Sequence, residues 1–488
     1  MPHCRLRTDL PSDKVRPAQF STHGFILMPR ASEADRNAPA SLEEAQRFLE
    51  RSPDHEKRPD VNYDRRNFNL DRTRAVLDAL GNPQKNLRVI HVAGTKGKGT
   101  TCALVERCLR EAGYRTGLFT SPHLRSICER MRVGGRSISE EDFCGLVGAA
   151  RSHIEDNRQN SPAEAPTYFE ILTGLAIRYF ADQEVEWAVA EVGLGGRLDS
   201  TNVLQPECCI ITSIGYDHMD KLGDTIEAIA GEKAGIMKDR TPVIIGRQRY
   251  DEAREVLKDH SQSHCCPCWE VGTEVRVDGQ RALTARRDNP NAPVGWQFDL
   301  NTPASNYLGL TTSLLGAHQL DNCAGAVAAL ELLRERNQLE ISEQSIRRGV
   351  HTCICPARVE VLQRQPALLL DTAHTVESIE ALLEAVKTHF PGRRLRIVFG
   401  CSADKDYSSM LRALAGHCKQ LILTRADFPR AADPERLATA AEQAGFESTK
   451  TVVPATQALE TCLAEAAPDD VVCVTGSFYV AGEIRLNR

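Results

Sequence analysis

The stretch that decides the fold reads HVAGTKGKGTT at residues 91–101. It closes the apolar run LRVIHVAG (87–94), and a continuous apolar run is typical of a strand buried in a parallel sheet. Residues 100–114 place apolar side chains at helical spacing, and RTGLFTSPH (115–123) predicts a second strand. A strand, a glycine-rich turn, a helix and a strand together predict a βαβ unit.

The turn between the first strand and its helix has the composition of a phosphate-binding loop. Glycines let backbone N–H groups approach an anion, and the N-terminus of the following helix favours negative charge. The strict pattern G-x-x-x-x-G-K-[ST] is not met, because Gly99 separates Lys98 from Thr100. A flexible glycine turn is the alternative. We expect an ATP-binding loop formed by Gly94, Thr95, Lys96, Gly97, Lys98, Gly99 and Thr100.

Charged side chains follow other predicted strands of the same sheet. Glu191 stands in the apolar run EWAVAEVG, Asp217 and His218 come after CCIITSIG, and Lys233 lies in the next predicted helix. Open α/β sheets bind ligands at the carboxyl ends of their strands. For each group taken alone, a solvated turn or helix surface is the alternative. Together, beside a phosphate loop, they predict a Mg²⁺ site.

The length of 488 residues predicts two domains. We expect an ATP-binding P-loop domain at 41–350, with an insertion at about 250–305 that forms a small antiparallel piece. A second alternation of strands and helices at 355–488 predicts a smaller, doubly wound, Rossmann-like α/β domain. Residues 1–40 lack the apolar core of a signal peptide, and we expect them to be an N-terminal tail that is either disordered or mis-annotated. A further hypothesis places the true start at Met28, with the residues before it mistranslated upstream sequence.

The composition argues against several classes of protein. A net charge of -6 gives no basic field for nucleic acid, and no apolar run approaches the roughly 20 residues that span a membrane. The 17 cysteines are odd in number and scattered, which favours a reducing cytoplasm. The cluster HCCPCW (264–269) has no second cysteine pair at zinc-finger spacing, so a surface insertion is favoured over a metal site. We expect a cytoplasmic monomer with small-molecule substrates and neither nucleic-acid nor membrane partners.

Several ordered motifs resemble the folylpolyglutamate synthase / dihydrofolate synthase family, relatives of the Mur ligases. Besides the phosphate loop they are SPHL, ERMRVGGRSIS, EVGLGGRLDSTN, ITSIGYDHMDKLGDTIEAIAGEKAGIMK, HQLDN, DTAH, DKD and TGSFYVAGEIR. The spacing at Gly99 favours this family over the Mur ligases themselves. The resemblance implies a P-loop, Mur-ligase-like ATPase domain followed by a C-terminal glutamate-ligase domain.

The resemblance also implies a ligand set for ATP and two Mg²⁺ ions. The first Mg²⁺ would be held by Thr100, Ser121 and Glu191. The second would be held by His218 and by Lys233, with Lys233 carbamylated by CO₂, which turns a cation into an anionic oxygen ligand. Further ATP contacts would come from Asn322, Arg358 and Asp371.

The same resemblance implies the substrate sites and the reaction. The incoming glutamate would bind near His374 and Ser477, and the pterin ring near Thr167, Phe169 and Asp199. A folate or dihydropteroate carboxylate would attack the γ-phosphate of ATP, and the glutamate amine would then displace phosphate from the acyl phosphate. The implied catalytic residues are Lys98, Glu191, His218, Lys233 and His374.

Two rival functions remain open at this point. One is a Mur-type ligase that acts on a cell-wall nucleotide precursor, and the Gly99 spacing and the SPHL segment argue against it. The other is a nucleotide-binding relative without ligase chemistry, and the retained Glu191, His218 and Lys233 argue against that. The residues do not decide whether dihydropteroate, a folate, or both accept the glutamate.

Overall fold

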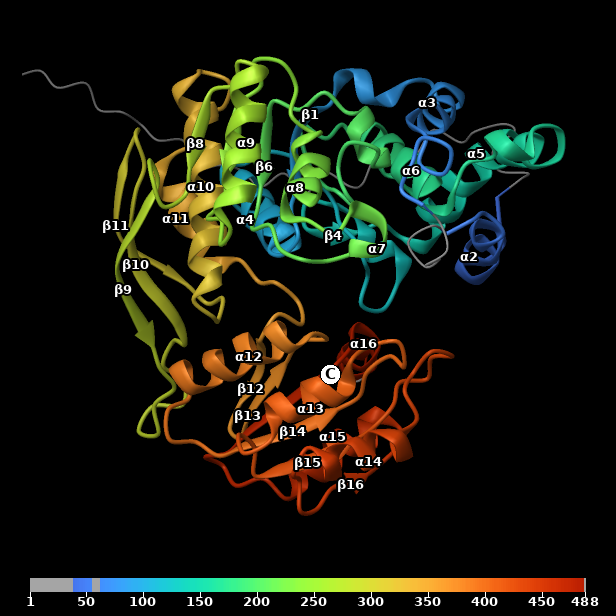
Figure 1. Ribbon diagram of the computed structural model, residues 1–488. Helices are drawn as coiled ribbons and strands as arrows, with labels where there is room; N and C mark the ends of the chain where they lie inside the picture. Colours follow the sequence, from blue (N-terminus) through green and yellow to red (C-terminus); the bar gives the residue numbers. More distant parts are fainter. Residues whose placement is uncertain (1–37, 55–61, 487–488) are drawn as a thin grey trace, which may run out of the picture.

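The computed structural model describes residues 38–54 and 62–486, which form two α/β domains one above the other in Figure 1. The hypothesis about Met28, and nearly all of the expected N-terminal tail, lie outside the described residues. The first described helix is α2 (Leu42–Glu50), and its N-cap Ser41 accepts a hydrogen bond from the backbone N–H of Glu44. No helix within the described ranges is long and apolar enough to cross a membrane.

The N-terminal domain is built on an eight-stranded sheet with the order β4-β3-β2-β5-β1-β6-β7-β8. The run from β2 to β8 is parallel, and β3 and β4 form an antiparallel edge. The strands are β1 (Arg88–Ala93), β2 (Thr116–Phe119), β3 (Met131–Val133), β4 (Arg136–Ser137), β5 (Trp187–Glu191), β6 (Cys208–Ile211), β7 (Val243–Ile245) and β8 (Cys268–Glu270).

Helices cover both faces of this sheet, which is why the central strands are apolar on both sides. Along β1, Ile90 and Val92 pack in the core under α4, whereas Val89 packs in the core under α6. The helices on the first face are α4 (Lys98–Glu111), α10 (His318–Glu335) and α11 (Glu343–Thr352). The other helices of the domain are α3 (Leu70–Ala79), α5 (Glu140–Asn160), α6 (Tyr168–Asp182), α7 (Met219–Leu222), α8 (Ile226–Ala234) and α9 (Asp251–Ser263). Short 3-10 turns are η1 (Pro83–Asn86), η2 (Ile127–Arg130), η3 (Pro162–Glu164) and η4 (Ser200–Val203).

The region expected as an insertion is only partly an antiparallel piece. Residues 276–312 form a three-stranded antiparallel sheet of β9 (Arg276–Leu283), β10 (Gly295–Asn301) and β11 (Asn306–Thr312). The assignment of 251–270 to the insertion was wrong, because α9 packs on α8 and β8 extends the main sheet. The sequence hid both elements: α9 buries only Ala253, Leu257 and Ser261, and β8 is three residues long beside cysteines and a proline.

The C-terminal domain is a six-stranded sheet with the order β12-β13-β17-β14-β15-β16, in which only β12 is antiparallel to its neighbour. This agrees with the predicted doubly wound, Rossmann-like architecture. Its strands are β12 (Glu360–Arg364), β13 (Ala367–Leu370), β14 (Leu395–Phe399), β15 (Gln420–Leu423), β16 (Lys450–Thr451) and β17 (Val471–Thr475). Its helices are α12 (Val376–His389), α13 (Tyr407–Leu414), α14 (Pro434–Gln443), α15 (Ala455–Ala464) and α16 (Phe478–Leu486).

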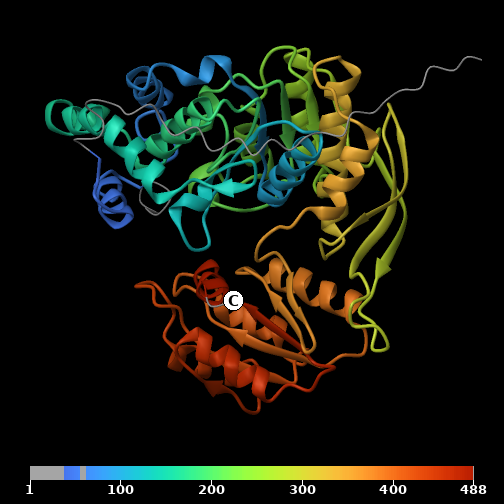
Figure 2. The ribbon, with the colours of Figure 1, turned by 180° about the vertical axis from the view of Figure 1, so that it is seen from behind.

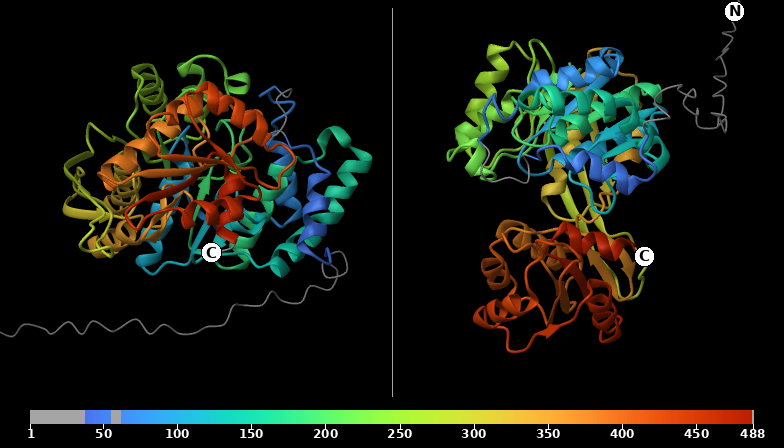
Figure 3. Two further views of the ribbon diagram at one scale, coloured as in Figure 1. Left: turned by 90° about the horizontal axis from the view of Figure 1, so that it is seen from below. Right: turned by 90° about the vertical axis from the view of Figure 1, so that its right-hand side faces the viewer.

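The three-stranded sheet runs along one side of the molecule from the N-terminal domain down to α12, as seen from the front and from behind in Figures 1 and 2. There the backbone N–H of Ala285 donates to the carbonyl of His389 at 2.8 Å, and the Trp296 and His389 rings meet edge to face. A second contact joins α16 to the segment after β2, where Leu124 packs on the C-terminal core. Figure 3 shows the C-terminal domain facing the N-terminal sheet across these connections.

Candidate active site

The carboxyl ends of the parallel strands converge at one edge of the N-terminal sheet. Val92 of β1 pairs with Glu191 of β5, and Ala93 pairs with Ile211 of β6, so the loops after these strands are neighbours. Ser121 follows β2, which lies on the other side of β5. The topology therefore brings together the phosphate loop and the charged groups expected from the sequence.

The phosphate loop, residues 94–100, is shaped by close approaches of its backbone to neighbouring elements. Gly97 has φ +91°, and a Cβ there would lie 2.4 Å from Oδ1 of Asn322 on α10, so no other residue fits this position without movement. Lys98 directs its Nζ back to the carbonyl of Gly94 at 3.1 Å. Lys96 reaches across to Oδ2 of Asp217 at 3.3 Å. The loop thus joins both lysines and Asn322 at the N-terminus of α4.

Glu191 is a buried carboxylate at the tip of β5, directly beside the start of α4. It is 5% exposed, accepts the backbone N–H of Ser121 at 3.1 Å, and lies 3.6 Å from the position that a Cβ on Gly99 would take. Burial raises the pKa of this carboxyl, while the charge of Lys98 opposes that rise. The hydroxyl of Thr100 is 3.5 Å from Sγ of Cys355 in the segment that joins the two domains.

Lys233 is a buried cation on α8, only 5% exposed. Burial, followed by the charge of Lys98, lowers its pKa to about 7, so a large fraction of its amine is neutral at physiological pH. His218 lies at the exposed start of α7 with its Nε2 3.8 Å from Oδ1 of Asp217. Although the side chain is half exposed, loss of hydration to the surrounding protein lowers the pKa of His218, and the charges of Lys98 and Lys233 lower it further. The three groups therefore lie in one electrostatic neighbourhood.

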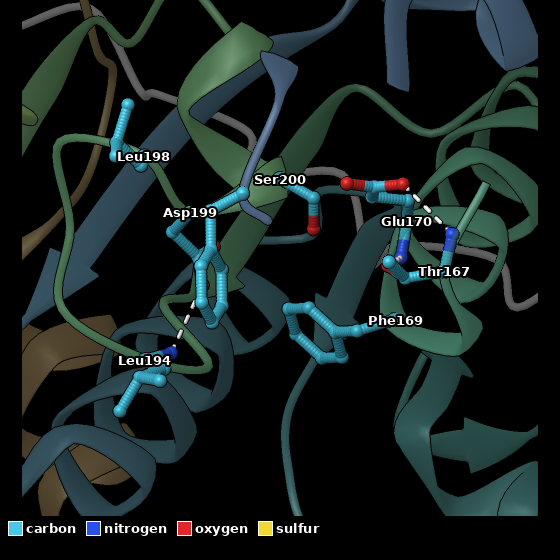
Figure 4. A pocket seen from close by; sticks show the side chains of 8 residues that line it. Thr167, Phe169, Glu170, Leu194, Leu198, Asp199 and Ser200 are labelled. Atoms are coloured by element: carbon cyan, nitrogen blue, oxygen red, sulfur yellow. Dashed lines mark hydrogen bonds between the residues drawn. The ribbon is translucent and has the colours of Figure 1, made fainter. Parts of the chain in front are cut away.

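A pocket beside this edge gathers the residues expected near a pterin ring. Thr167, Phe169 and Asp199 line it together with Phe68, Glu170, Leu194, Leu198 and Ser200. Figure 4 shows Phe169 and Ser200 directed into the space between Asp199 and the start of α6. The wall is therefore apolar and aromatic with a few oxygen atoms, which suits a flat, polar-edged ring.

The expected glutamate-site and remaining ATP-site residues lie on the C-terminal domain and its connection. Asp371 follows β13 and accepts the backbone N–H groups of Val359 and Ala373 at 2.8 and 2.7 Å. The Arg358 guanidinium lies 5.2 Å from the Phe478 ring, and its charge opposes the burial-driven rise in the pKa of Asp371. The charge of Arg358 also opposes the rise in the pKa of Glu191. The segment that joins the two domains therefore faces Glu191.

His374 and Ser477 lie at the carboxyl edge of the second sheet. His374 contacts the Phe478 ring at 5.8 Å between centroids, and its Nδ1 is 2.8 Å from the carbonyl of Thr372. Ser477 caps α16 by accepting the backbone N–H groups of Tyr479 and Val480. Burial lowers the pKa of His374, and a smaller contribution comes from Lys96 of the phosphate loop. The residues expected at the glutamate site therefore lie on the side of the C-terminal domain that faces the phosphate loop.

Several residues that shape the site were not predicted from the sequence. The hydroxyl of Tyr63 accepts the backbone N–H groups of Gly196 and Leu198 at 3.3 and 3.2 Å, which fixes the glycine-rich turn after β5. Arg72 pairs with Glu170 through two hydrogen bonds of 2.9 and 2.8 Å. Only Glu170 carried a readable signal, because TYFE forms a capping box with Thr167.

No three His, Cys, Asp or Glu side chains within residues 38–54 and 62–486 converge closely enough to hold a metal ion by themselves. A Mg²⁺ ion at the phosphate loop would need hydroxyl, backbone or phosphate oxygens besides Glu191, and such oxygen ligands are the ones that this ion prefers.

Comparisons with known proteins agree with this geometry. Residues 92–330 match the Mur ligase middle domain, and residues 357–478 match the Mur ligase glutamate ligase domain. The dihydrofolate synthase/folylpolyglutamate synthase of Bacillus subtilis is 37% identical over 85% of this chain and 94% of its own length. The folylpolyglutamate synthase of Mycobacterium tuberculosis, solved with ADP and AMPPCP, superposes with a TM-score of 0.79 at 30% identity, covering 91% of this chain and 98% of that one. FolC of Escherichia coli, solved with DHPP and ADP, gives a TM-score of 0.77 at 29% identity over 92% of this chain and 98% of that one.

The fold, the phosphate loop and these matches define an ATP-dependent ligase of the Mur type. Within that superfamily, the chain belongs to the folylpolyglutamate synthase / dihydrofolate synthase family. The predictions of family, fold class and ATP-dependent ligase are confirmed. The two rival functions lose their support, because the similar proteins named above are folate ligases.

Proposed function

We propose that this enzyme joins L-glutamate to the carboxylate of a folate or of dihydropteroate through an acyl phosphate. The observation that carries the proposal is the shared edge: the phosphate loop, Glu191 and the pocket of Thr167, Phe169 and Asp199 open on one side of the sheet. The Escherichia coli relative was solved with DHPP and ADP together, which supports a pterin-bearing substrate beside a nucleotide.

The ATP site would be formed by the loop from Gly94 to Thr100 with Asn322, Arg358 and Asp371. Backbone N–H groups at the start of α4 would bind the phosphates, as helix N-termini do. Lys98 would release its own loop carbonyls and neutralise the transferring phosphoryl group, where negative charge develops. We assign residues 41–350 to this ATP-binding unit and 355–488 to the unit that supplies glutamate.

The residues fit two Mg²⁺ ions. Thr100, Ser121 and Glu191 would hold one, since the Glu191 carboxylate already accepts the backbone N–H of Ser121 and lies beside the start of α4. His218 and Lys233 would hold the other, and a neutral, buried Lys233 amine is the form that reacts with CO₂ to give a carbamate. When bound, such ions would stabilise the negative charge on the phosphoryl group as it is transferred from ATP to the carboxylate.

The C-terminal domain would bring the amino acid to the activated carboxylate. His374 and Ser477 would contact the incoming glutamate, whose amine attacks the acyl carbon and releases inorganic phosphate. Closing the space between the domains excludes water, which would otherwise hydrolyse the acyl phosphate. Thr167, Phe169 and Asp199 would hold the ring of the acceptor in place during both steps.

We further propose a cytoplasmic, monomeric enzyme. Every cysteine that the structure describes is a free thiol, which fits a reducing compartment.

A product assay by mass spectrometry tests the substrate. The protein is incubated with ATP, Mg²⁺ and glutamate, in one reaction with dihydropteroate and in another with tetrahydrofolate monoglutamate. Glutamate addition to both acceptors identifies a bifunctional enzyme, and addition to one assigns the specialised activity. If neither acceptor gains glutamate while ATP is still bound, the proposal fails.

A further inference from the structure

A chain of buried polar groups runs behind the wall of the substrate pocket. It starts at His91 in β1, whose Nε2 lies 2.8 Å from Oγ1 of Thr201, and that hydroxyl in turn contacts Oδ1 of Asp199. His91 and Thr201 are fully buried, and Asp199 is 3% exposed. The chain thus links the central strand of the sheet to a carboxylate that lines the pocket.

The direction of each hydrogen bond in this chain follows from the groups themselves. The Thr201 hydroxyl donates its proton to Oδ1 of Asp199, so its oxygen is left to accept from His91. Burial, assisted by the charge of Lys238, lowers the pKa of His91 to about 3, so the ring is neutral with its one N–H on Nε2. Its Nδ1 has no hydrogen-bond partner among the described residues. A buried nitrogen left without a partner destabilises the fold, so an apolar residue would serve packing better.

Asp199 is held by its own chain on both carboxylate oxygens. Oδ1 accepts the backbone N–H of Thr201 at 2.9 Å, and Oδ2 accepts the backbone N–H of Leu194 at 2.9 Å. Oδ1 also accepts the Thr201 hydroxyl, which fills both of its lone pairs, whereas Oδ2 keeps a lone pair that can accept from the pocket. These bonds fix the carboxylate and leave it as an acceptor.

The neighbouring Ser200 is oriented by a second, independent chain. The Thr173 hydroxyl donates to the carbonyl of Phe169 at 2.9 Å, and Oγ of Ser200 lies 2.6 Å from Oγ1 of Thr173. Because the Thr173 proton is already committed, the Ser200 proton points to Thr173, away from the pocket. Ser200 therefore offers the pocket only lone pairs, as Asp199 does.

We propose that His91 and Thr201 are positioning residues that hold Asp199 as a fixed acceptor, so that the pocket selects a ring carrying N–H donors. This inference rests on the proposed function, and it deepens that function by naming the feature of the acceptor that is read: the amino and ring N–H edge of a 2-aminopyrimidine. His91 and Thr201 act through Asp199 and do not touch the ligand.

The test compares two ligands of the ADP-bound enzyme, pteroate and its 2-desamino analogue, by calorimetry. The wild type should prefer pteroate roughly tenfold, the scale of one charge-assisted hydrogen bond. Thr201→Val and His91→Leu should each erode this preference several-fold and raise the KM for the acceptor, with kcat and the KM for ATP little changed. Thr201→Ser keeps the hydroxyl and should restore the preference.

Thr73→Val is the matched control, because Thr73 is a fully buried threonine of the same domain whose hydroxyl has no partner among the described residues. It should leave the preference at the wild-type value. If the wild type binds neither ligand, the proposed function fails. If Thr201→Val folds and keeps the full preference for pteroate, or if it weakens both ligands equally, the positioning role is refuted while the proposed function stands.

Discussion

Replacing Gly482 in α16 by alanine should disturb the contact between the domains without harming either fold. The Cβ of an alanine there would lie 2.2 Å from the carbonyl oxygen of Leu124, where an ordinary contact needs about 3.4 Å. The two backbone segments must therefore separate by about 1 Å. Leu124 lies three residues after Ser121, whose N–H is bonded to Glu191, so the displacement reaches the phosphate-loop edge.

The expected result is a loss of ligase turnover with an intact fold. Misplacement of reacting groups by about 1 Å can reduce a rate roughly 100-fold, so we expect kcat to fall between about tenfold and 100-fold. Alanine stabilises a helix over glycine by about 1 kcal/mol, so the melting temperature should not fall. Steady-state kinetics and thermal unfolding measure the two quantities. Gly145→Ala in α5 is the control, because a Cβ there meets nothing within 4 Å. Wild-type turnover in Gly482→Ala would refute the reasoning.

Three further predictions concern the site itself. Lys98→Met should lower kcat by about 100-fold or more, since it removes the cation beside the transferring phosphoryl group, and a rate within a few-fold of wild type would contradict that role. Because the pKa of Lys233 is about 7, the fraction of its amine that is neutral and able to react with CO₂ increases as the pH rises through 7. The ¹³C signal of a carbamate formed from labelled bicarbonate should therefore increase over the same pH range, and it should be missing in Lys233→Gln. Arg72→Met leaves the buried Glu170 carboxylate without its main partner, so the free energy of unfolding measured in denaturant titrations should fall by about 3–5 kcal/mol. A fall below about 1 kcal/mol would contradict this, because it would mean that water or a neighbouring group replaces Arg72.

The elements readable from the sequence were those with a long apolar run and a clear end. β1, the phosphate loop and α4 lie where they were predicted, and α4 ends shortly before Gly113, whose φ of +95° stops the helix. α9 and β8 were not readable, because a helix with three buried positions and a strand of three residues leave almost no periodic signal.

The site was partly readable for the same reason. Glu191 and the loop lysines stand at strand ends, where the parallel topology gathers them without further information. Contacts across long stretches of chain left no trace in the sequence: Tyr63 fixes the turn at Gly196, and His91 reaches Thr201, each more than 100 residues away. Asn322 was implied only by resemblance, and its closeness to Gly97 emerges once α10 packs on the sheet.

The most direct test of the central claim follows an oxygen atom. The acceptor, carrying ¹⁸O in the carboxylate that gains glutamate, is incubated with the enzyme, ATP, Mg²⁺ and glutamate, and the released phosphate is analysed by mass spectrometry. If the carboxylate attacks the γ-phosphate and the amine then displaces phosphate, one ¹⁸O moves to inorganic phosphate for each amide bond formed. Amide formation with unlabelled phosphate would contradict activation through an acyl phosphate.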